Sequence, residues 1–406
     1  MTNTATQEKL WNADYVKVWT ANFLMSFAFM LINPLLPLFL TDTFAADKQT
    51  IGVTLAGYSV AALLIRPFSG YFVDNFPRKA VLLVSYGLSC CFFLGYMAAT
   101  TLTAFAFFRT LHGFPFGTTT VSCTTLAVDA LPSRHRAEGI GYYGLSANLG
   151  SALGPTVALW IFDWTQSYQT LFAVSFAVTL AGVVLCATLH LKPRPSAKTG
   201  APSASPRPRA KLVSLDRFLL LKASSQAMCT LAFGVTYSVV TTYLAIYGRE
   251  ELGITGGTGL FFLLLAIGLI VSRLVGSKSL GEGKITQNAL LGMCIALAGY
   301  AMFAGLHNRF GYYASALVIG LGQGYAWPAF LNMFLDLAPH ERRGTANATI
   351  LTSWDLGLGI GMLLGGVTAQ RAGYHAAFWV SVGVYAAALA LFLLHGKRHF
   401  ERNRLR

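Results

Sequence analysis

The chain has 406 residues, of which 54% are hydrophobic and only 11% are charged. A water-soluble domain normally carries about 25% charged residues, so this composition argues against a soluble globular protein. The formal net charge of +14 would indicate nucleic-acid binding only if the basic residues gathered on one folded face. They fall mostly between long apolar runs, so we expect no nucleic-acid partner.

In chain order, a polar tail over residues 1–14 is followed by apolar segments that are each long enough to cross a bilayer as a helix. A segment rich in Pro, Ser and basic residues over 191–213 cannot bury a core and is predicted to be a linker. It separates a six-helix bundle over 15–190 from a second one over 214–395, and a basic tail follows over 396–406. The predicted spans are 15–40, 51–73, 79–99, 102–129, 138–162, 168–190, 214–247, 255–277, 285–305, 310–336, 343–369 and 374–395.

The basic residues divide unequally between the two sides of this arrangement. If both termini and the linker share one side, the loops on that side hold about 24 of the 30 Lys and Arg residues. The positive-inside rule then places both termini in the cytoplasm, facing anionic lipid headgroups. We expect an integral multi-pass protein of a bacterial cytoplasmic (inner) membrane.

The two predicted bundles repeat each other in sequence. The run Asp129-Ala-Leu-Pro132 with Arg136 recurs as Asp336-Leu-Ala-Pro339 with Arg343. The same offset of about 207 residues aligns one arginine and four glycines of each half. Parallel six-helix repeats place a binding site near the middle of the membrane and alternate its access by rocking, which predicts a transporter. The aligned pairs are Arg66 with Arg273, Gly113 with Gly320, Gly117 with Gly324, Gly150 with Gly357 and Gly154 with Gly361.

Three motifs resemble those of the major facilitator superfamily. The loop after the second span runs from Gly70 through Asp74 to Arg78 and Lys79, although Asn75 and Pro77 depart from the usual pattern. The fourth span carries Arg109, His112 and spaced glycines. The fifth carries Gly150, Gly154 and Pro155, similar to the antiporter motif but with Ala158 and Leu159 in place of its trailing glycines.

The resemblance covers nearly the whole chain and implies an all-α fold of twelve helices in two pseudo-symmetric bundles. The closest likeness is to drug or metabolite exporters that exchange their substrate for protons, and such proteins commonly act as monomers. The resemblance also implies that Asp74 ties the halves together in the outward-facing state. The loop residues Gly70, Asp74, Arg78 and Lys79 are therefore candidate gating residues, and an ordinary exposed ion pair is the alternative interpretation. The fifth-span motif is expected to form a seam against the other half, or else to serve simple helix packing.

Three ionisable residues lie deep in predicted spans and are candidates for proton coupling: Asp355, Arg109 and His112. Asp355 lies about 18 Å into its span at 1.5 Å per residue, and its repeat partner is the neutral Asn148. A permanently protonated Asp355 with one hydrogen bond is the alternative. The acidic partner that the family supplies to Arg109 from the first span is missing here. His112 is either a proton relay or a neutral structural residue, and Arg66 is expected to brace the cytoplasmic end of its span.

Polar and aromatic side chains follow one face of the first and fourth helices of each half, at equivalent repeat positions. This pattern predicts a cavity for a small amphipathic organic molecule, although each stripe alone is also typical of helix packing. The candidate cavity residues are Asn22, Phe29, Asn33, Phe116, Gln226, Thr230, Tyr237, Thr241, Gln323, Trp327 and Phe330.

Three functions are compatible with these features. The first is export of an organic molecule driven by inward proton movement, and the second is uptake by proton symport. The third is a membrane receptor or enzyme, but the sequence shows no nucleophile or metal constellation and no phosphate-binding loop. The six cysteines have no metal-ligand spacing. We therefore expect a transporter and not an enzyme, with a small molecule and protons as partners and without cofactor or metal.

Overall fold

The computed structural model describes residues 9–132, 136–190, 219–254, 258–339 and 343–405. The predicted linker over 191–213 and the first residues of the N-terminal tail lie outside these ranges. Helices make up all the regular structure within them: α1 (Ala13–Ile32), α2 (Leu36–Phe44), α3 (Lys48–Asn75), α4 (Arg78–Ala98), α5 (Leu102–Ala130), α6 (Arg136–Thr165), α7 (Tyr168–Ala187), the 3-10 helix η3 (Leu221–Ala223), α8 (Ser224–Leu252), α9 (Thr258–Gly281), α10 (Ile285–Gly305), α11 (Arg309–Asp336), α12 (Arg343–Leu391), the π-helix η5 (Phe392–Gly396) and α13 (Lys397–Asn403).

Short polar side chains start several of these helices. Asn12, Asp47, Thr101, Ser167 and Asn308 each accept a hydrogen bond from the backbone N–H three residues further on. Such a cap satisfies one of the N–H groups that a helix leaves without a partner in its first turn. These side chains therefore mark where α1, α3, α5, α7 and α11 begin.

The structure breaks one predicted span and keeps the boundary between the last two. The segment predicted over 15–40 is broken between α1 and α2, where Asn33 and Pro34 separate Ile32 from Leu36. A proline has no backbone N–H and hinders the helical turn before it, which explains the break. The element labelled α12 consists of two helices that meet at Gly373, whose φ of 84° and ψ of 169° are not helical, so the boundary between the spans predicted over 343–369 and 374–395 agrees with the structure. Only glycine adopts this conformation without strain.

Within the described ranges, nine helical segments are long and apolar enough to cross a bilayer. The helices α5 and α11 are also of membrane length, at 29 and 28 residues, but do not reach the hydropathy of the others. Both carry polar side chains in their middle turns, including Arg109 and His112 in α5 and Gln323 in α11. Polar groups at that depth usually mark a site rather than a lipid-facing surface.

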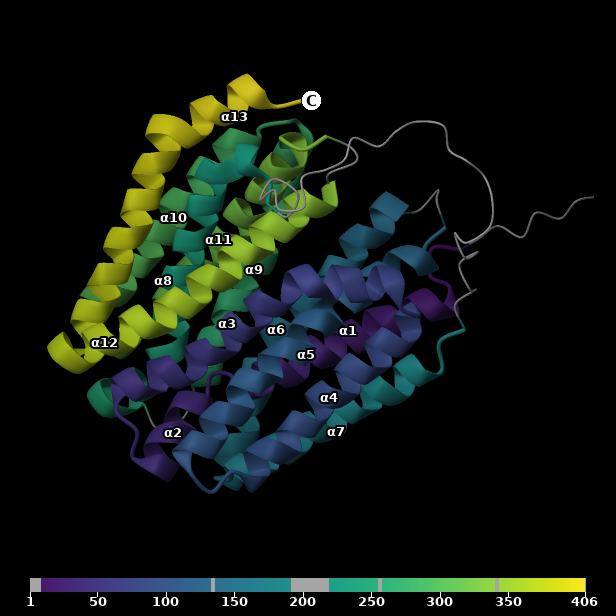
Figure 1. The fold of residues 1–406 in the computed structure, drawn as a ribbon. Helices are drawn as coiled ribbons and strands as arrows, with labels where there is room; N and C mark the ends of the chain where they lie inside the picture. The colour runs from purple at the N-terminus through teal and green to yellow at the C-terminus, as the bar shows by residue number, and fades with distance from the viewer. Residues whose placement is uncertain (1–8, 133–135, 191–218, 255–257, 340–342, 406) are drawn as a thin grey trace, which may run out of the picture.

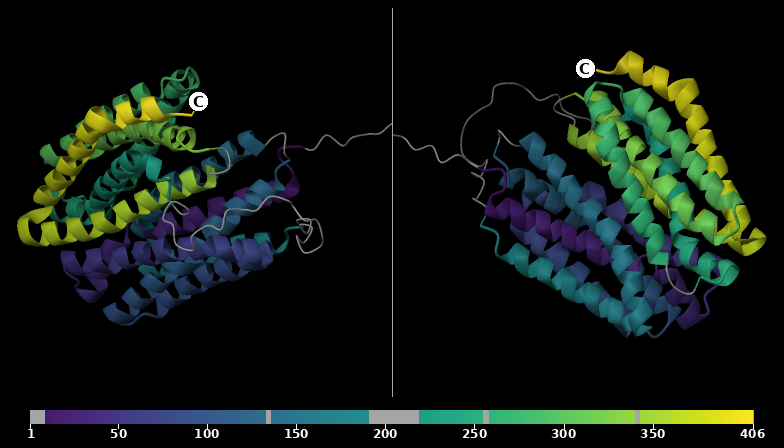
Figure 2. Two further views of the ribbon diagram at one scale, coloured as in Figure 1. Left: turned by 45° about the horizontal axis from the view of Figure 1, so that its top comes forward. Right: turned by 180° about the vertical axis from the view of Figure 1, so that it is seen from behind.

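The helices form two groups, α1–α7 and α8–α13, as the purple-to-teal and green-to-yellow parts of Figure 1 and Figure 2 show. The repeat glycines have equivalent places in the two groups. A Cβ on Gly113 would lie 2.3 Å from the carbonyl O of Tyr58 on α3, and a Cβ on Gly320 would lie 2.1 Å from that of Leu265 on α9. Each glycine therefore lets two helix backbones approach closely, which is how small residues stabilise helix pairs in lipid.

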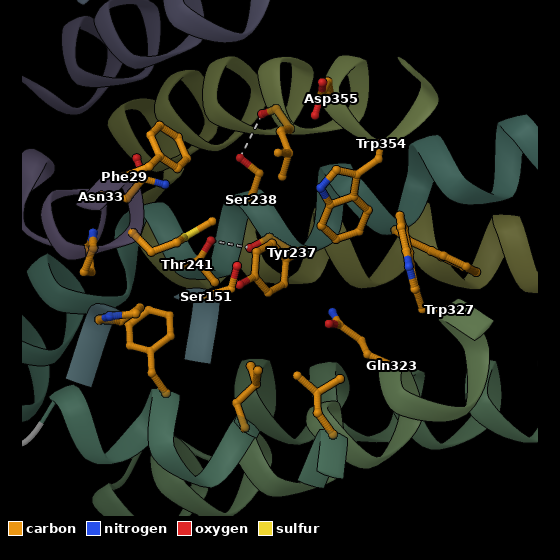
Figure 3. Close-up of a pocket in the computed structure, with 18 of the residues that line it drawn as sticks. Phe29, Asn33, Ser151, Tyr237, Ser238, Thr241, Gln323, Trp327, Trp354 and Asp355 are labelled. Carbon is orange, nitrogen blue, oxygen red and sulfur yellow. Dashed lines mark hydrogen bonds between the residues drawn. The ribbon is translucent and has the colours of Figure 1, made fainter. Parts of the chain in front are cut away.

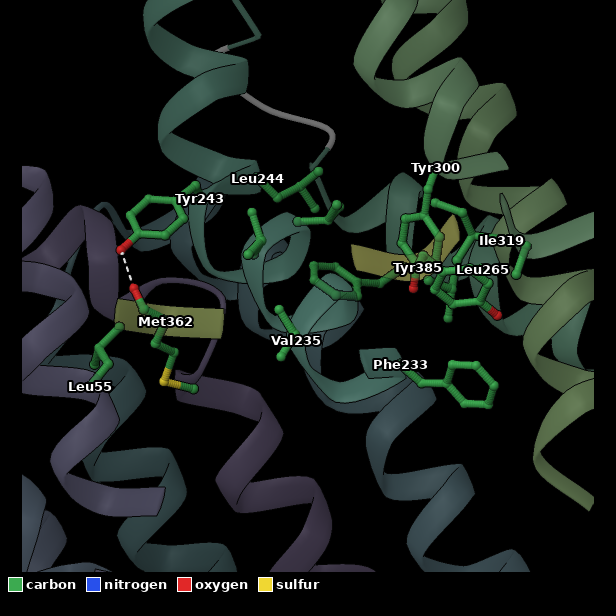
Figure 4. Packing of buried hydrophobic residues seen from close by; sticks show 14 of the residues in the cluster. Leu55, Phe233, Val235, Tyr243, Leu244, Leu265, Tyr300, Ile319, Met362 and Tyr385 are labelled. Atoms are coloured by element: carbon green, nitrogen blue, oxygen red, sulfur yellow. Dashed lines mark hydrogen bonds between the residues drawn. The ribbon is translucent and has the colours of Figure 1, made fainter. Parts of the chain in front are cut away.

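The two groups are joined at the end remote from the chain termini. The Arg249 guanidinium contacts the Asp42 carboxylate at 2.8 Å, and the Lys48 ammonium lies 3.9 Å from Glu250. The Tyr243 hydroxyl of α8 lies 3.3 Å from the carbonyl O of Lys48 across the seam. Within its own group it donates a hydrogen bond of 2.9 Å to the carbonyl O of Met362 (Figure 4). From this end the seam continues along α3 and α12, and toward the termini the ribbons of the two groups diverge (Figure 1).

Candidate functional site

A cavity of about 500 Å³ lies between the two groups of helices. Helices α1, α3, α5 and α6 line it from one side, and α8, α9, α11 and α12 line it from the other. Figure 3 shows side chains from both groups pointing into it. Its volume is within the range of pockets that hold drug-sized molecules. Seven of the predicted cavity residues lie in the lining: Phe29, Asn33, Phe116, Tyr237, Thr241, Gln323 and Trp327.

Each group of helices contributes an aromatic cluster to the wall. In the first cluster, the Phe29 ring lies 5.0 Å from that of Tyr58 and 4.8 Å from that of Phe116, centroid to centroid. The second cluster consists of Tyr237, Trp327 and Trp354, with the Trp354 ring 5.4 Å and 5.1 Å from the other two. Aromatic faces on two walls suit a molecule with a flat apolar part.

Arg109 lies in the cavity wall and is completely buried. Its Nη2 donates a hydrogen bond of 2.9 Å to the side-chain oxygen of Asn33, and its guanidinium carbon lies 4.3 Å from the ring centroid of Tyr58. The family's usual acidic partner is therefore replaced by an amide oxygen and an aromatic face. These groups attract a cation but do not neutralise its charge.

His112 lies one turn further along α5 but is not in the cavity lining. Its Nδ1 lies 2.7 Å from the Tyr96 hydroxyl, and its ring stacks on that of Phe92 at 5.4 Å. The side chain is 2% exposed. This packing explains why the histidine, which the sequence predicts to be a coupling residue, stays in the protein interior next to the cavity wall.

Asp355 lies in the cavity wall on α12 and forms an ion pair with Arg66 of α3. Both side chains are largely buried, at 18% and 15% exposed. The sequence places Arg66 at the cytoplasmic end of its span as a brace, whereas the structure brings it to the deep carboxylate. The pair crosses the seam between the two groups of helices, so a proton taken up by Asp355 would act directly on their contact.

Four predicted cavity residues are not in the lining and pack inside one group of helices instead. The structure differs here from the sequence prediction because these polar groups find protein partners. Asn22 donates to the Ser146 hydroxyl at 2.8 Å, and Gln226 donates to the carbonyl O of Gly396 at 3.1 Å. Thr230 donates back to the carbonyl O of Gln226, and Phe330 packs against the ring of Phe233 at 4.9 Å.

Gly150 and Gly154 face α1 within their own group of helices. A Cβ on Gly150 would lie 2.7 Å from the backbone N of Phe27, and one on Gly154 would lie 2.8 Å from the Cβ of Met30. These two glycines therefore serve packing inside the first half, which is the alternative interpretation. The contact of α6 with the other half begins just after them, where Thr156 and Leu159 lie against Gly259 of α9. Pro155, the third residue of the motif, lines the cavity.

The candidate gating loop makes its described contacts within the first half. Arg78 forms an ion pair with Asp129, and the Lys79 ammonium donates to the carbonyl O of Leu189 at 2.7 Å. Nothing lies within 4 Å of a Cβ on Gly70. The side chain of Asp74 lies outside the described residues, so its proposed link to the other half stays a prediction.

Several residues of the cavity wall were not predicted from the sequence: Tyr58, Ser59, Ser151, Ser238, Arg273 and Trp354. Arg273 carried a signal, because it is the repeat partner of Arg66. Ser59 and Tyr58 lie on α3, and Ser151 lies on α6, which were not among the helices expected to line the cavity. The periodic polar and aromatic pattern marks only the first and fourth helices of each half, so it does not indicate residues on α3 and α6.

Comparisons with known proteins agree with this architecture. Residues 18–358 and 289–405 match the family model described as Major Facilitator Superfamily. The chain is 24% identical over 385 residues to the quinolone resistance protein NorA of Staphylococcus aureus strain MSSA476, covering 93% of this chain and 95% of that protein. It is 21% identical over 372 residues to the staphylopine export protein of Staphylococcus aureus strain Mu50, with 89% and 90% covered.

Among solved structures, the fold is similar to that of a bacterial homologue of the human lysosomal transporter Spinster, in an inward-facing and occupied conformation. The TM-score is 0.76 at 12% sequence identity, and 97% of each chain is covered. At this identity the likeness shows the fold alone. The family model matches nearly the whole sequence, and the structure has apolar helices with a cavity between them. The chain therefore belongs to the Major Facilitator Superfamily, and it is a multi-pass membrane transporter of small molecules and not an enzyme.

Proposed function

We propose that this transporter exports a small amphipathic organic molecule in exchange for protons that move inward. In this proposal the chain crosses the membrane twelve times, with both termini and the linker over 191–213 in the cytoplasm. The bundles over 15–190 and 214–395 rock against each other as a monomer. The asymmetric distribution of Lys and Arg between the loops supports this orientation.

The observation that carries the proposal is the cavity between two groups of helices that are joined at one end. The side chains that join them lie remote from the termini, where Asp42 meets Arg249 and the Tyr243 hydroxyl meets the carbonyl O of Lys48. If the termini are cytoplasmic, the cavity communicates with the cytoplasm and is separated from the outside. That is the state in which an exporter loads its substrate.

Asp355 is the proposed proton-binding residue. As a carboxylate it holds Arg66 across the seam, and as a neutral acid it would release that hold. Proton uptake is thereby linked to the contact between α3 and α12, which must change when the cavity opens to the other face. Arg109 lies in the wall of the same cavity and His112 lies one turn away on α5, and both remain candidates for proton coupling in this proposal.

The names of the relatives support export over uptake. One is called a quinolone resistance protein and the other a staphylopine export protein. Proton-coupled uptake is the second candidate function, because Ala158 and Leu159 replace the glycine pair that usually ends the antiporter motif.

The direction of flux separates the two functions. Purified full-length protein is reconstituted into liposomes that contain a fluorescent pH indicator, and a pH gradient is imposed. Norfloxacin, as a quinolone, is the first probe of a wider panel of amphipathic compounds. For an exporter, substrate and protons cross in opposite directions, and for a symporter they cross together. If no compound of the panel crosses the membrane together with protons or against them, the proposal is contradicted.

The Asp355→Asn variant tests the coupling. We expect it to keep substrate binding but to move substrate only down its own gradient, because the amide cannot exchange a proton. The double variant Arg66→Gln/Asp355→Asn removes both charges. It leaves no buried arginine without its carboxylate, so it serves as the second variant if Asp355→Asn alone misfolds. Uphill transport at the wild-type rate in either variant would show that Asp355 is structural.

A further inference from the structure

The charges in the cavity wall do not balance. Among the described residues, the charged side chains in the lining are Arg109, Arg273 and Asp355. Asp355 is already paired with Arg66, which approaches from α3. Two arginines are therefore left in the wall without a carboxylate partner in the described part of the chain.

Arg109 is the more buried of the two. Its side chain is fully enclosed, and its Nε–H has no hydrogen-bond partner among the described residues. The groups around it are neutral: the amide oxygen of Asn33 at 2.9 Å, the Tyr96 hydroxyl at 3.5 Å and the ring of Tyr58. A guanidinium is always charged in proteins, and leaving it buried without an anion is strongly unfavourable.

Arg273 is in the same situation on the other side of the cavity. It lies on α9, and its Nε–H also lacks a hydrogen-bond partner among the described residues. Its repeat partner, Arg66, is neutralised by Asp355. In the sequence, the repeat partner of Asp355 is Asn148. The position that would supply a carboxylate to Arg273 by the repeat is therefore a neutral asparagine. Of the two repeat-related arginines, Arg66 therefore has a carboxylate partner and Arg273 has none among the described residues.

We infer that the two arginines form an anion-binding site and that the substrate is an aromatic molecule with a carboxylate or a similar oxyanion. This inference rests on the proposed function, whose substrate class it specifies. A guanidinium binds a carboxylate through two parallel hydrogen bonds, and the Nε–H of each of these arginines has no partner in the part of the chain that the structure describes. The aromatic clusters then hold the apolar part, and Gln323 and Thr241 supply hydrogen bonds to other polar groups.

The test compares three probes that share one aromatic body and differ in charge. These are biphenyl-4-carboxylate, biphenyl-4-carboxamide and biphenyl-4-ylmethylammonium, titrated by calorimetry into purified full-length protein in detergent. We expect the carboxylate to bind at least about tenfold more tightly than the amide, since a hydrogen bond to a charged group is worth a factor of about 10 to 100. The ammonium should bind most weakly.

Two variants locate the effect. Arg109→Gln and Arg273→Gln should each weaken carboxylate binding about tenfold while changing amide binding by less than about twofold. Arg309→Gln is the matched control, because Arg309 lies at the start of α11 and donates to the carbonyl O of Gly253 outside the cavity. It should leave all three affinities unchanged.

Equal binding of the carboxylate and the amide by the wild-type protein would overturn the inference, as would no binding of the carboxylate at millimolar concentration. The wild-type comparison needs no variant, so a misfolded variant does not obscure it. The measurement also needs no transport. Selective anion binding without proton-linked flux would keep the site and reject the proposed function, whereas flux without anion selectivity would reject the site alone.

Discussion

Gly52 offers a direct test of how the two groups of helices are held together. It lies on α3, where α3 meets α12 at the end remote from the termini. A Cβ on Gly52 would lie 2.4 Å from the carbonyl O of Met362 and 2.8 Å from the hydroxyl of Tyr243, whereas ordinary contacts are 3.4–4 Å. The Tyr243 hydroxyl itself donates to that carbonyl (Figure 4). The Gly52→Ala substitution therefore requires α3 and α12 to separate by about 1 Å.

The size of the effect follows from the cost of overpacking, which is about 1–3 kcal/mol. If only the state joined at this end carries that cost, the balance between the two states moves about 5- to 150-fold toward the one that opens there. Gly87→Ala is the matched control. Gly87 lies on α4 with nothing within 4 Å of a Cβ, and the gain in helix propensity is the same for both substitutions.

Electron-spin distance measurements can report this shift. Spin labels at Trp164 and Phe310, which are 82% and 72% exposed at the ends of α6 and α11, mark the two groups on the joined face. The exposed Cys91 and Cys294 are first replaced by serine. We expect a second, longer distance to gain population in Gly52→Ala and not in Gly87→Ala. Identical distributions in a folded, monodisperse Gly52→Ala protein would refute the reasoning.

Two further predictions concern ion pairs. Burial opposes ionisation of Asp42, but hydrogen bonds from Arg249 and Tyr168 outweigh it and lower the pKa of this carboxyl. Its contribution to stability, no more than about 1 kcal/mol for so exposed a pair, is present above the usual pKa near 4 and is lost as pH falls through the lowered value. The difference in unfolding temperature between wild type and Asp42→Asn should therefore stay constant down to about the usual pKa near 4 and shrink as pH falls below it. A difference that does not shrink under acidic conditions would contradict this. Asp355→Asn should destabilise the protein by about 3–5 kcal/mol because it leaves Arg66 charged and buried. In thermal unfolding, adding Arg66→Gln should restore part of that stability. If the losses from the two substitutions simply add, the two residues are not paired.

Much of the architecture could be predicted because the membrane restricts the choice. A bilayer accepts only helices of a certain length, so the apolar segments and the caps before them locate the elements. The family model and the fold comparison confirm the predicted superfamily. The break between α1 and α2 was missed because a single hydropathy window covers both, although Pro34 and Pro37 were visible in the sequence.

The cavity could be predicted less completely, for a physical reason. Hydropathy and periodicity show that a face is polar, but they do not show which partner each polar group finds. Gln226 satisfies its amide on the backbone of Gly396, a residue far away in the sequence, and so leaves the cavity wall. In the same way Arg66 appeared to be a residue of the membrane surface until the fold placed it beside Asp355. Partnerships between distant helices are a property of the folded chain.

The ion pair between Arg66 and Asp355 has a consequence for the movement of the protein. It lies in the seam between α3 and α12, beside the cavity. A movement that parts these helices must hydrate both ions or hand them to new partners, because bare charges are unstable in a medium of low dielectric constant. Opening of the seam is thus controlled by the entry of water as well as by apolar packing, and the energy barrier between the two faces carries an electrostatic component.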